Sequence, residues 1–567
     1  MTNAPSPDAE RSFRIRRLLF TVLMLAMGIV HTFLTTESAY VLAVTVDEFG
    51  HVPVGYNVLT TGDFGFCELN PPLMNVLAAL PLRAWPLVPS GEVGPLGRDA
   101  GYDFWGNGYR FMDLYRRDYL RAFFLAREAS TLAAAFLGLL AGLWAIRFDT
   151  MGIWRAALLA MGLVWFSPNL LAHASLATTD MGAAFSFGWT LLAAHAWFER
   201  PTRWRAAVLG VVLGLAQLVK FSAVLLFPLL LVPGVGLLRT RRAPVRRVVA
   251  GLALALALCL LVINAGYLFQ RTGRPLGSFS FRSPPFASLQ AHLPRALPVP
   301  LPESFVRAFD RQLFDAREGD PSYLLGQPYF GGRWDYFLTL LLLKVPVPLV
   351  LLALAAVAVR IVGRRLREED AFLLLPALFV LVIFSFFSQK QLGLRMILPA
   401  APLFWIWVSV ALSRVPFTVP RAAVLAALMG WLGVEVARVR PDPLGYFNGL
   451  AQEPGGYPLA GDSNLDWGQG LTALADFLHT RGEAGPVQLY YFGRVDPALY
   501  GIDYVVPERV QPGLVVVSAS LFTRPYVLYD HGQLVEQPRL SPVPARFHLV
   551  TRLMHSLYVY KVDPPGK

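Results

Sequence analysis

Charged residues are scarce in this chain. Only 16% of its 567 residues are Asp, Glu, Lys or Arg, whereas soluble domains carry roughly 25%. Apolar residues make up 55% of the sequence, and its mean hydropathy is +0.48. This composition excludes a protein whose whole surface is in water and indicates an integral membrane protein.

Cysteine is scarce as well, with two residues in the whole chain. Cys67 falls in a loop and Cys259 in the middle of an apolar run, so we expect no disulfide between them. The sequence also lacks an internal repeat, a Walker loop and a dinucleotide-binding fingerprint, which are the signatures of repeat arrays and nucleotide-binding domains.

The balance of charge is basic, with a net charge of +12 and a pI of about 9.8. Such a balance can indicate nucleic-acid binding. Here, however, the basic residues occur in short clusters between apolar runs and form no continuous stripe. We therefore expect a lipid bilayer as partner and no nucleic acid.

Eleven apolar runs predict about eleven spanning helices, several of them shorter than the roughly 20 residues of a straight span. They are Leu18–Leu34, Phe123–Ile146, Ala156–Leu171, Met181–Phe198, Ala206–Val219, Ser222–Leu238, Val248–Tyr267, Phe337–Val359, Ala371–Phe387, Met396–Leu412 and Ala422–Val436. The first run follows the basic segment Arg11–Arg17 and has no clear cleavage site after it. It predicts a signal-anchor helix with a cytoplasmic N-terminus.

Basic residues then fall in alternate loops, as cytoplasmic loops require. These loops contain Arg147 and Arg155; Arg200, Arg203 and Arg205; Arg239, Arg241, Arg242, Arg246 and Arg247; Arg360, Arg364, Arg365 and Arg367; Arg414 and Arg421. The alternation predicts a transmembrane domain over residues 1–438 with long outward loops at 35–121 and 269–335. Residues 439–567 are expected to form a small extracytoplasmic α/β domain, with a helix at Leu471–His479 and strand-like runs elsewhere.

The first outward loop opens with two adjacent acids, Asp47 and Glu48, followed by His51. Two adjacent acids at a membrane surface cost free energy unless they are solvated, paired with a cation or used in catalysis. An ordinary water-exposed loop, however, also carries acids freely. Further on, Pro72 precedes the apolar run Met74–Leu82, and proline in the first turn is a normal helix start. The loop therefore carries candidate acids beside an apolar helix.

Short motifs follow one another in a fixed order between Leu18 and Leu412. They are Asp47-Glu48, Gly62-Asp63, Pro71-Pro72-Leu73, Ala126-Arg127-Glu128-Ala129-Ser130, Ala177-Thr178-Thr179-Asp180, Lys220, Gly332-Arg333-Trp334-Asp335-Tyr336-Phe337, Lys344-Val345-Pro346 and Arg395 before Met396–Pro402. Their order resembles the polyprenyl-phosphate-sugar-dependent glycosyltransferases of the GT-C class, which include protein O-mannosyltransferases and the bacterial lipid A aminoarabinose transferase. In the tail, Tyr446-Phe447-Asn448 and the phrase Asp462–Gln469 (DSNLDWGQ) resemble a bacterial branch of the same enzymes.

The resemblance implies a membrane all-α fold, a GT-C-like helical bundle in the bacterial inner membrane. It also implies transfer of a sugar from a polyprenyl phosphate to an extracytoplasmic hydroxyl of a protein, lipid or glycan, with an inverting outcome. A phosphate leaving group needs little protonation, so a single carboxylate that deprotonates the acceptor is sufficient. By the family pattern Asp47 is that base and Glu48 shapes the site.

Charge developing on the leaving phosphate requires fixed cations. Lys220 and Arg395 are the outward-facing candidates, although either side chain can also simply reach the lipid headgroups. Lys390 is a nearby lysine to which no role is assigned. In the sequence Glu68-Leu69-Asn70-Pro71, Asn70 replaces the lysine of the aminoarabinose transferase, which moves phosphate binding to Lys220, Arg395 or a metal ion.

Acceptor-binding or structural roles are open for several other polar residues. His51 belongs here, and so does Asp180, which is equally explained as an acid in the first turn of a span. Asp462 and Asp466 fit ordinary turn chemistry before a helix, while Trp467 offers a ring for stacking on a sugar. A divalent metal is possible because five outward residues carry suitable donor atoms, although they lack tight ligand spacing. These residues are Asp47, Glu48, His51, Glu68 and His173.

Two other functions compete with the enzyme. A transporter or lipid-carrier flippase is expected to show charged or helix-breaking residues within spans of paired halves, and these spans are nearly free of charge. A structural or assembly protein, with the tail as its working part, leaves the pair Asp47-Glu48 unexplained.

Overall fold

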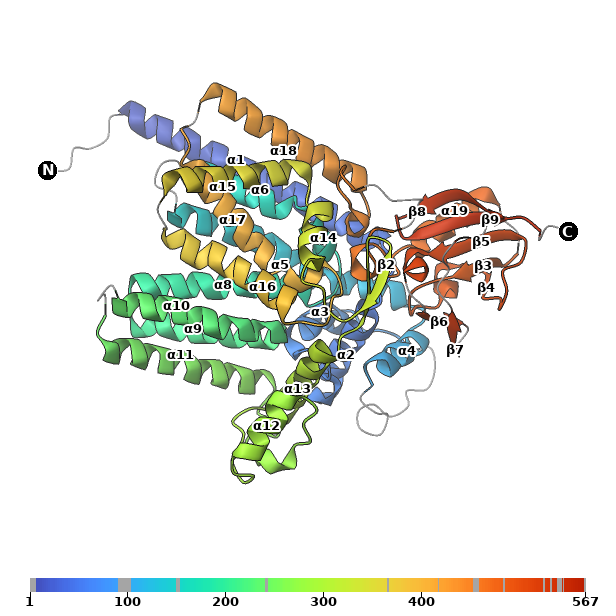
Figure 1. The fold of residues 1–567 in the computed structure, drawn as a ribbon, viewed down its shortest axis with the longest axis horizontal. Helices are drawn as coiled ribbons and strands as arrows, with labels where there is room; N and C mark the ends of the chain where they lie inside the picture. The colour runs from blue at the N-terminus through green and yellow to red at the C-terminus, as the bar shows by residue number, and fades with distance from the viewer. Residues whose placement is uncertain are drawn as a thin grey trace.

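The computed structural model describes residues 7–89, 103–148, 153–239, 243–364, 367–416, 418–451, 458–482, 485–523, 526–530, 533–537, 543 and 545–564. The long helices run side by side in one bundle, and a β-sheet from the end of the chain lies at one end of it (Figure 1). Short helices lie at the same end of the bundle, α4 near the sheet and α12 and α13 farther from it. The structure is therefore mostly helical with a small C-terminal sheet, as the sequence predicts.

Each predicted apolar run is largely helical in the structure. The bundle contains α1 (Pro7–Val41), α5 (Tyr119–Phe148), α6 (Ile153–Trp165), α7 (Pro168–Ala174), α8 (Asp180–Glu199), α9 (Arg203–Val219), α10 (Leu226–Arg239), α11 (Val245–Gly266), α14 (Tyr336–Lys344), α15 (Val347–Gly363), α16 (Leu375–Phe386), α17 (Ala400–Ser413) and α18 (Val419–Val439). Among the described residues, 5 helices are long and apolar enough to cross a membrane, or up to 7 if two bent pairs each count as one span. The count of eleven spans is therefore not confirmed.

Two runs predicted as continuous spans are broken. Helices α6 and α7 meet at 64°, and helices α14 and α15 meet at 114°. The second break falls at Val345, which has an extended conformation (φ −89°, ψ 127°) before Pro346, because proline excludes the helical conformation from the residue that precedes it. The run Phe337–Val359, predicted as one span, therefore contains a sharp bend with Lys344 beside it.

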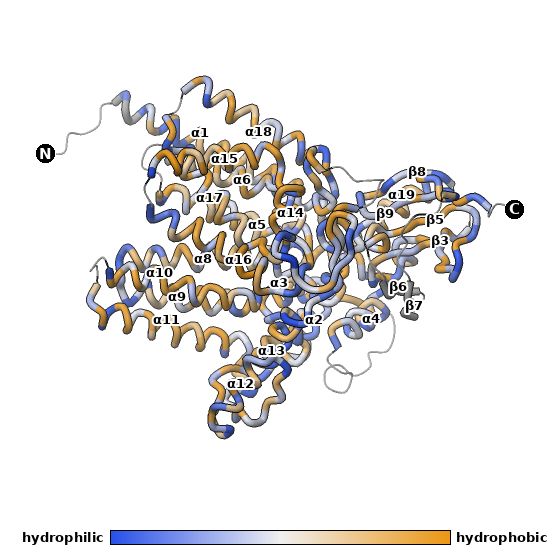
Figure 2. Tube along the Cα trace, viewed as in Figure 1, coloured by the Kyte–Doolittle hydropathy of each residue, from blue (hydrophilic) through white to orange (hydrophobic). Residues whose placement is uncertain are grey.

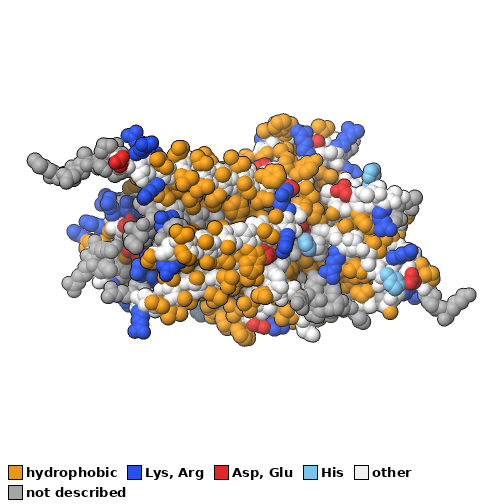
Figure 3. Space-filling view, turned by 90° about the horizontal axis from the view of Figure 1, so that it is seen from above, with side chains coloured by type: hydrophobic (Ala, Val, Ile, Leu, Met, Phe, Trp, Pro, Cys, Tyr) orange, Lys and Arg blue, Asp and Glu red, His pale blue; other side chains and the backbone are white. Residues whose placement is uncertain are grey.

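The loops predicted to be cytoplasmic gather at one end of the bundle. Arg147 at the end of α5 pairs with Glu199 at the end of α8, and Arg414 after α17 lies 2.5 Å from Glu369 before α16. Figures 2 and 3 show the same arrangement, with apolar helices between ends that carry charged residues. An apolar belt bounded by charged ends is the surface that a bilayer requires.

We expect this charged end to face the cytoplasm and the C-terminal sheet to lie outside. The variants Arg246→Cys and Val550→Cys test the expectation, since both positions are exposed while Cys67 and Cys259 are buried. A membrane-impermeant maleimide added to intact cells or spheroplasts should label residue 550 at once and residue 246 only after permeabilisation. The reverse pattern would contradict the orientation inferred from the basic loops.

The outward loops fold into short helices over the other end of the bundle. The first contains α2 (Glu48–Thr61), α3 (Pro72–Ala84) and α4 (Phe104–Leu114), and the second contains α12 (Pro284–His292), α13 (Glu303–Glu318) and the hairpin β1 (Pro321–Leu324) with β2 (Gln327–Phe330). Helix α3 begins at Pro72, as predicted, because proline at the first helical position has no N–H to leave unpaired.

The tail after α18 forms a five-stranded mixed sheet in the order β4-β3-β5-β9-β8. Its elements are α19 (Leu471–Arg481), β3 (Val487–Tyr490), β4 (Tyr504–Val505), β5 (Gly513–Ser518), β8 (Phe547–Leu553) and β9 (Leu557–Val562), and β6 (Tyr526–Asp530) pairs with β7 (Gln533–Gln537) separately. Alternate residues of β5 point to opposite faces of the sheet. Val516 packs in one apolar cluster with Leu471 of α19, while Val515 and Val517 pack in a second cluster. The predicted helix and the main strands are confirmed.

Candidate active site

A cavity of about 1010 Å³ lies at the end of the bundle opposite the basic clusters, which is the end predicted to face outward. It is enclosed by the first outward loop, α13, the segment before α17 and the tail. Its lining includes six of the nine predicted site residues, namely Asp47, His51, Lys220, Arg395, Asp462 and Trp467, and also Asn70. Chain segments separated by hundreds of residues therefore converge on one space.

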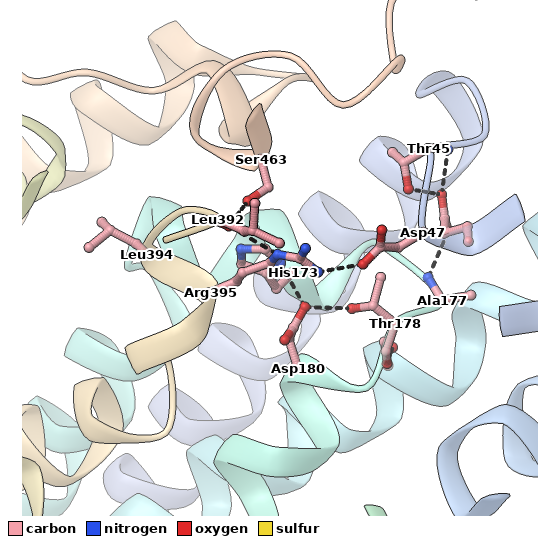
Figure 4. Close-up of polar contacts among 12 residues, drawn as sticks. Thr45, Asp47, His173, Ala177, Thr178, Asp180, Leu392, Leu394, Arg395 and Ser463 are labelled. Atoms are coloured by element: carbon pink, nitrogen blue, oxygen red, sulfur yellow. Dashed lines mark hydrogen bonds and ion pairs between the residues drawn. The ribbon is translucent and has the colours of Figure 1, made fainter. Parts of the chain in front are cut away.

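Asp47 and Arg395 form an ion pair at the wall of this cavity. Asp47 directly precedes α2, and Arg395 lies in η6 (Leu394–Ile397). Arg395 Nη1 lies 2.5 Å from Asp47 Oδ2, and Arg395 Nε donates to the carbonyl of Leu392 at 3.1 Å (Figure 4). Burial lowers the pKa of Arg395, but the carboxylates of Asp47, Asp180 and Asp462 outweigh this effect and raise it, so the guanidinium stays charged.

Lys220 forms the second ion pair of the site. It follows the last residue of α9, and its Nζ lies 2.5 Å from Oδ1 of Asp180, the buried first residue of α8. Thr178 Oγ1 donates to Asp180 Oδ2 at 3.1 Å, and His173 Nδ1 lies 3.7 Å from the same oxygen. Asp180 is thus an acid in the first turn of a helix, as predicted, and it also fixes the ammonium that lines the cavity.

Both cations keep donors for a further anion. In the described part of the chain, Arg395 uses Nη1 on Asp47 and Nε on Leu392, whereas a guanidinium has five N–H donors. Lys220 directs one ammonium donor to Asp180 out of three. Each cation therefore has donors left for an anion that enters the cavity, without breaking its ion pair.

Glu48 lies beside the cavity and is fully buried. Its carboxylate accepts hydrogen bonds from Arg127 Nε at 2.8 Å and Nη2 at 2.7 Å, from Ala177 N at 2.7 Å, and from the N and Oγ1 of Thr45. Arg127 also donates to three carbonyls at the end of α1. Glu48 therefore ties α1, α5 and the segment before α8 together behind Asp47, and we assign it a positioning role.

We expect Glu48→Gln to destabilise the protein by about 3–5 kcal/mol, because breaking a buried ion pair leaves Arg127 charged and uncompensated. Burial raises the pKa of Glu48, but Arg127 and the hydrogen bonds lower it below its usual value overall, so this contribution is present at neutral pH. Thermal unfolding in detergent measures the loss. Glu128→Gln, a half-buried acid next to Arg127 on α5, is the matched control, and equal melting temperatures for the two variants would refute the assignment.

The tail phrase Asp462–Gln469 is buried at the site, which corrects the expectation of surface turns. Asp466 is 1% exposed, and its oxygens accept N–H bonds from Gly468 at 3.1 Å and Ser520 at 2.9 Å. Burial raises the pKa of Asp466 to about 7, against the effect of these hydrogen bonds. Asp462 lines the cavity and has a left-handed backbone (φ 57°). The phrase is thus an internal part of the protein.

The ring of Trp467 packs against the guanidinium of Arg395. The Cζ atom of Arg395 lies 4.4 Å from the centre of its ring, and the residue is 1% exposed. A guanidinium over an indole ring is a favourable contact, worth about 2 kcal/mol or more where water is excluded. The ring therefore supports Arg395, and little of its surface is left for the sugar stacking considered from the sequence.

The structure does not gather the five candidate metal donors into one group. Glu48 is held by Arg127, and Glu68 lies 3.2 Å from Arg311 on α13. Among the described residues no three His, Cys, Asp or Glu side chains are placed to hold a metal ion together. His51 lines the cavity, and burial lowers its pKa, so its imidazole is neutral at physiological pH.

Several residues with structural roles at the site had no assigned role in the sequence. Arg127 and Lys344 both occur in quoted motifs. Lys344 is buried, donates to the carbonyls of Leu444 and Asn464, and lies 4.5 Å from the ring of Phe447. The feature of the sequence that could have indicated this contact is a lone lysine, two residues before a proline, within an apolar run. Lys390, to which no role was assigned, lines the cavity and lies 3.4 Å from Asp320.

No family model matches the chain, and no curated protein matches its sequence. Solved structures align over nearly its whole length. ArnT from Cupriavidus metallidurans aligns at 15% identity in the form bound to undecaprenyl phosphate, covering 96% of this chain and 99% of that one with a TM-score of 0.45. The apo form gives 15% identity, 97% and 100% coverage and a TM-score of 0.47.

The archaeal oligosaccharyltransferase AglB from Archaeoglobus fulgidus, in complex with an inhibitory peptide and a dolichol-phosphate, aligns at 12% identity. The alignment covers 92% of this chain and 75% of that one with a TM-score of 0.45. All three TM-scores lie below 0.5. ArnT is the GT-C lipid A aminoarabinose transferase, one of the enzymes that the motif order resembles.

Proposed function

We propose that this protein is a membrane glycosyltransferase that moves a sugar from a polyprenyl-phosphate donor to an extracytoplasmic acceptor hydroxyl. The observation that carries the proposal is the pair Asp47–Arg395, which lies with Lys220 in a single large cavity at the outer end of an apolar bundle. One carboxylate beside two cations is the set of groups that this transfer requires.

The reaction joins the acceptor oxygen to the anomeric carbon of the sugar. The bond from that carbon to the phosphate oxygen breaks, and its electron pair stays on the phosphate. Asp47 takes the proton of the acceptor hydroxyl. Asp47 suits this role because its side chain is 23% exposed, and it therefore reaches both the cavity and Arg395.

Arg395 and Lys220 hold the phosphate before and after transfer. Negative charge accumulates on the phosphate as the bond breaks, and cations held in place by their ion pairs stabilise that charge. Arg395 is 13% exposed and already bonded to Asp47, so it can place the phosphate beside the base. Its planar guanidinium also offers two parallel donors, which an ammonium lacks.

We also propose how the chain crosses the membrane. We take all eleven apolar runs as membrane segments, some bent or short, with residues 1–438 as the transmembrane domain and residues 439–567 as an extracytoplasmic domain. The membrane is the bacterial inner membrane. A flippase remains the alternative, and it differs in chemistry because it moves the lipid-linked sugar without breaking the bond between sugar and phosphate.

Mass spectrometry of envelope glycans, glycolipids and glycoproteins tests the function. Cells that lack the protein should lose one modification, wild-type protein should restore it, and Asp47→Asn should not. Restoration of the modification by Asp47→Asn would contradict the enzymatic role.

A further inference from the structure

The segment that leads into Asp47 is bonded to the tail. Of the four backbone N–H groups in residues 43–46, three donate to tail residues more than 400 positions away. The pairs are Ala43 N with Gln469 O at 3.0 Å, Val44 N with Tyr500 Oη at 2.9 Å, and Val46 N with Trp467 O at 2.9 Å. The fourth donates to Glu48. A segment whose four backbone amides all donate hydrogen bonds has little freedom to move.

Side chains of the same segment are buried against the tail. Leu42 packs in a cluster with Trp467, Ala43 in a cluster with the α19 and β3 residues, and Val44 in a cluster with Val495. Three consecutive residues thus enter three different apolar clusters, each containing part of the tail. The contact is a packed interface and not an isolated hydrogen bond.

The same tail phrase holds the segment that carries Arg395. Ser463 Oγ donates to Leu392 O at 2.6 Å, and Leu394 N donates to Asn464 Oδ1 at 3.2 Å. Figure 4 shows Ser463 lying against Leu392, on the opposite side of the site from the residues around Asp47. The ring of Trp467 also packs against Arg395. The tail therefore contacts both the segment that carries Asp47 and the segment that carries Arg395.

We propose that the C-terminal domain completes the active site in cis, and that Trp467 and Tyr500 are positioning residues for Arg395 and Asp47, respectively. The inference rests on the proposed function and gives the tail a part in it. Neither residue is required to touch the substrate. Their effect is to keep the base and the phosphate-binding cation at one separation, to which a transfer reaction is sensitive.

Substitutions of Trp467 test the part that concerns Arg395. Trp467→Leu should raise the donor KM by roughly 30-fold through loss of a desolvated cation–aromatic contact. Trp467→Phe should recover most of the affinity because a ring face remains. A merely structural tryptophan would lower the yield of folded protein for both variants and leave the donor KM of the folded fraction unchanged, which would overturn the assignment.

Substitution of Tyr500 tests the part that concerns Asp47. Tyr500→Phe removes one hydroxyl and should lower kcat by roughly 2- to 12-fold with the donor KM unchanged. Hydrogen exchange gives a readout that needs no activity, since the amide of Val44 should lose protection. Tyr490→Phe is the matched control, because Tyr490 donates only within the tail, to Pro507 O at 2.8 Å.

Unchanged exchange around residue 44 in Tyr500→Phe, or equal changes in both tyrosine variants, would overturn the inference. If wild-type protein shows no transfer at all, the proposed function fails, and the exchange experiment still decides whether the tail positions this segment.

Discussion

Asp47→Asn should lower transfer by about 10²–10⁴-fold, the contribution of a typical general base. The amide has nearly the shape of the carboxylate but cannot take a proton from the acceptor. The surrounding fold should persist, because Glu48 and the tail, rather than the Asp47 side chain, hold this segment. Turnover with a labelled donor in nanodiscs measures the loss.

Donor binding separates this role from a structural one. Asp47→Asn releases Arg395 from its carboxylate partner, so affinity for polyprenyl phosphate should stay equal or increase while kcat falls. Asp118→Asn is the matched control, since Asp118 is a half-buried acid of the same loop that lies outside the lining of the cavity. Retention of more than about a tenth of wild-type turnover by Asp47→Asn, or equal damage in the control, would remove Asp47 from the role of base.

Arg395→Gln should weaken donor use by roughly 10- to 150-fold, because a charge-assisted contact is worth about 1.5–3 kcal/mol and each 1.4 kcal/mol is tenfold. Lys220→Gln should have a smaller effect, since an ammonium lacks the bidentate grip of a guanidinium. Arg395→Lys should restore only part of the affinity for the same reason. The measured quantity is the KM for a labelled polyprenyl-phosphate sugar in nanodiscs.

Arg274→Gln is the control for general surface charge. Arg274 lies on the second outward loop, bonds to Glu303 at 2.7 Å and lies outside the lining of the main cavity. Lys390, to which the sequence assigns no role, is unsuitable as a control because it lines that cavity. Comparable losses in Arg274→Gln and Arg395→Gln would indicate a nonspecific effect of charge at the membrane surface.

The sequence predicted the helices well because apolar runs and basic loops are local signals. It placed Asp47, Lys220 and Arg395 at outer ends of helices, and the structure brings all three to one cavity. Bends were harder to foresee, because a proline within an apolar run fits both a kinked span and a break. The angle of 114° between α14 and α15 depends on what packs beside them.

The role of the tail could not be read from the sequence. Asp466 and Trp467 occur among small polar residues, which is typical of surface turns. Trp467 is buried by contacts with residues 42–46, more than 400 positions away, and with Arg395. Asp466 is buried within the tail, where its carboxylate accepts hydrogen bonds from Gly468 and Ser520. Glu48 was similarly ambiguous, since two adjacent acids gave no indication that one faces the cavity while the other is bonded to Arg127.

The most direct test of the central claim is to follow the bond between sugar and phosphate. Purified wild-type protein in nanodiscs is incubated with undecaprenyl phosphate carrying a labelled sugar, across a panel of sugars, and with envelope acceptors from cells that lack the protein. The account predicts that label enters a non-donor acceptor while undecaprenyl phosphate is released in equal amount, and that Asp47→Asn releases none. Intact donor throughout the panel, with labelled lipid crossing the bilayer of proteoliposomes, would contradict the account and indicate a flippase.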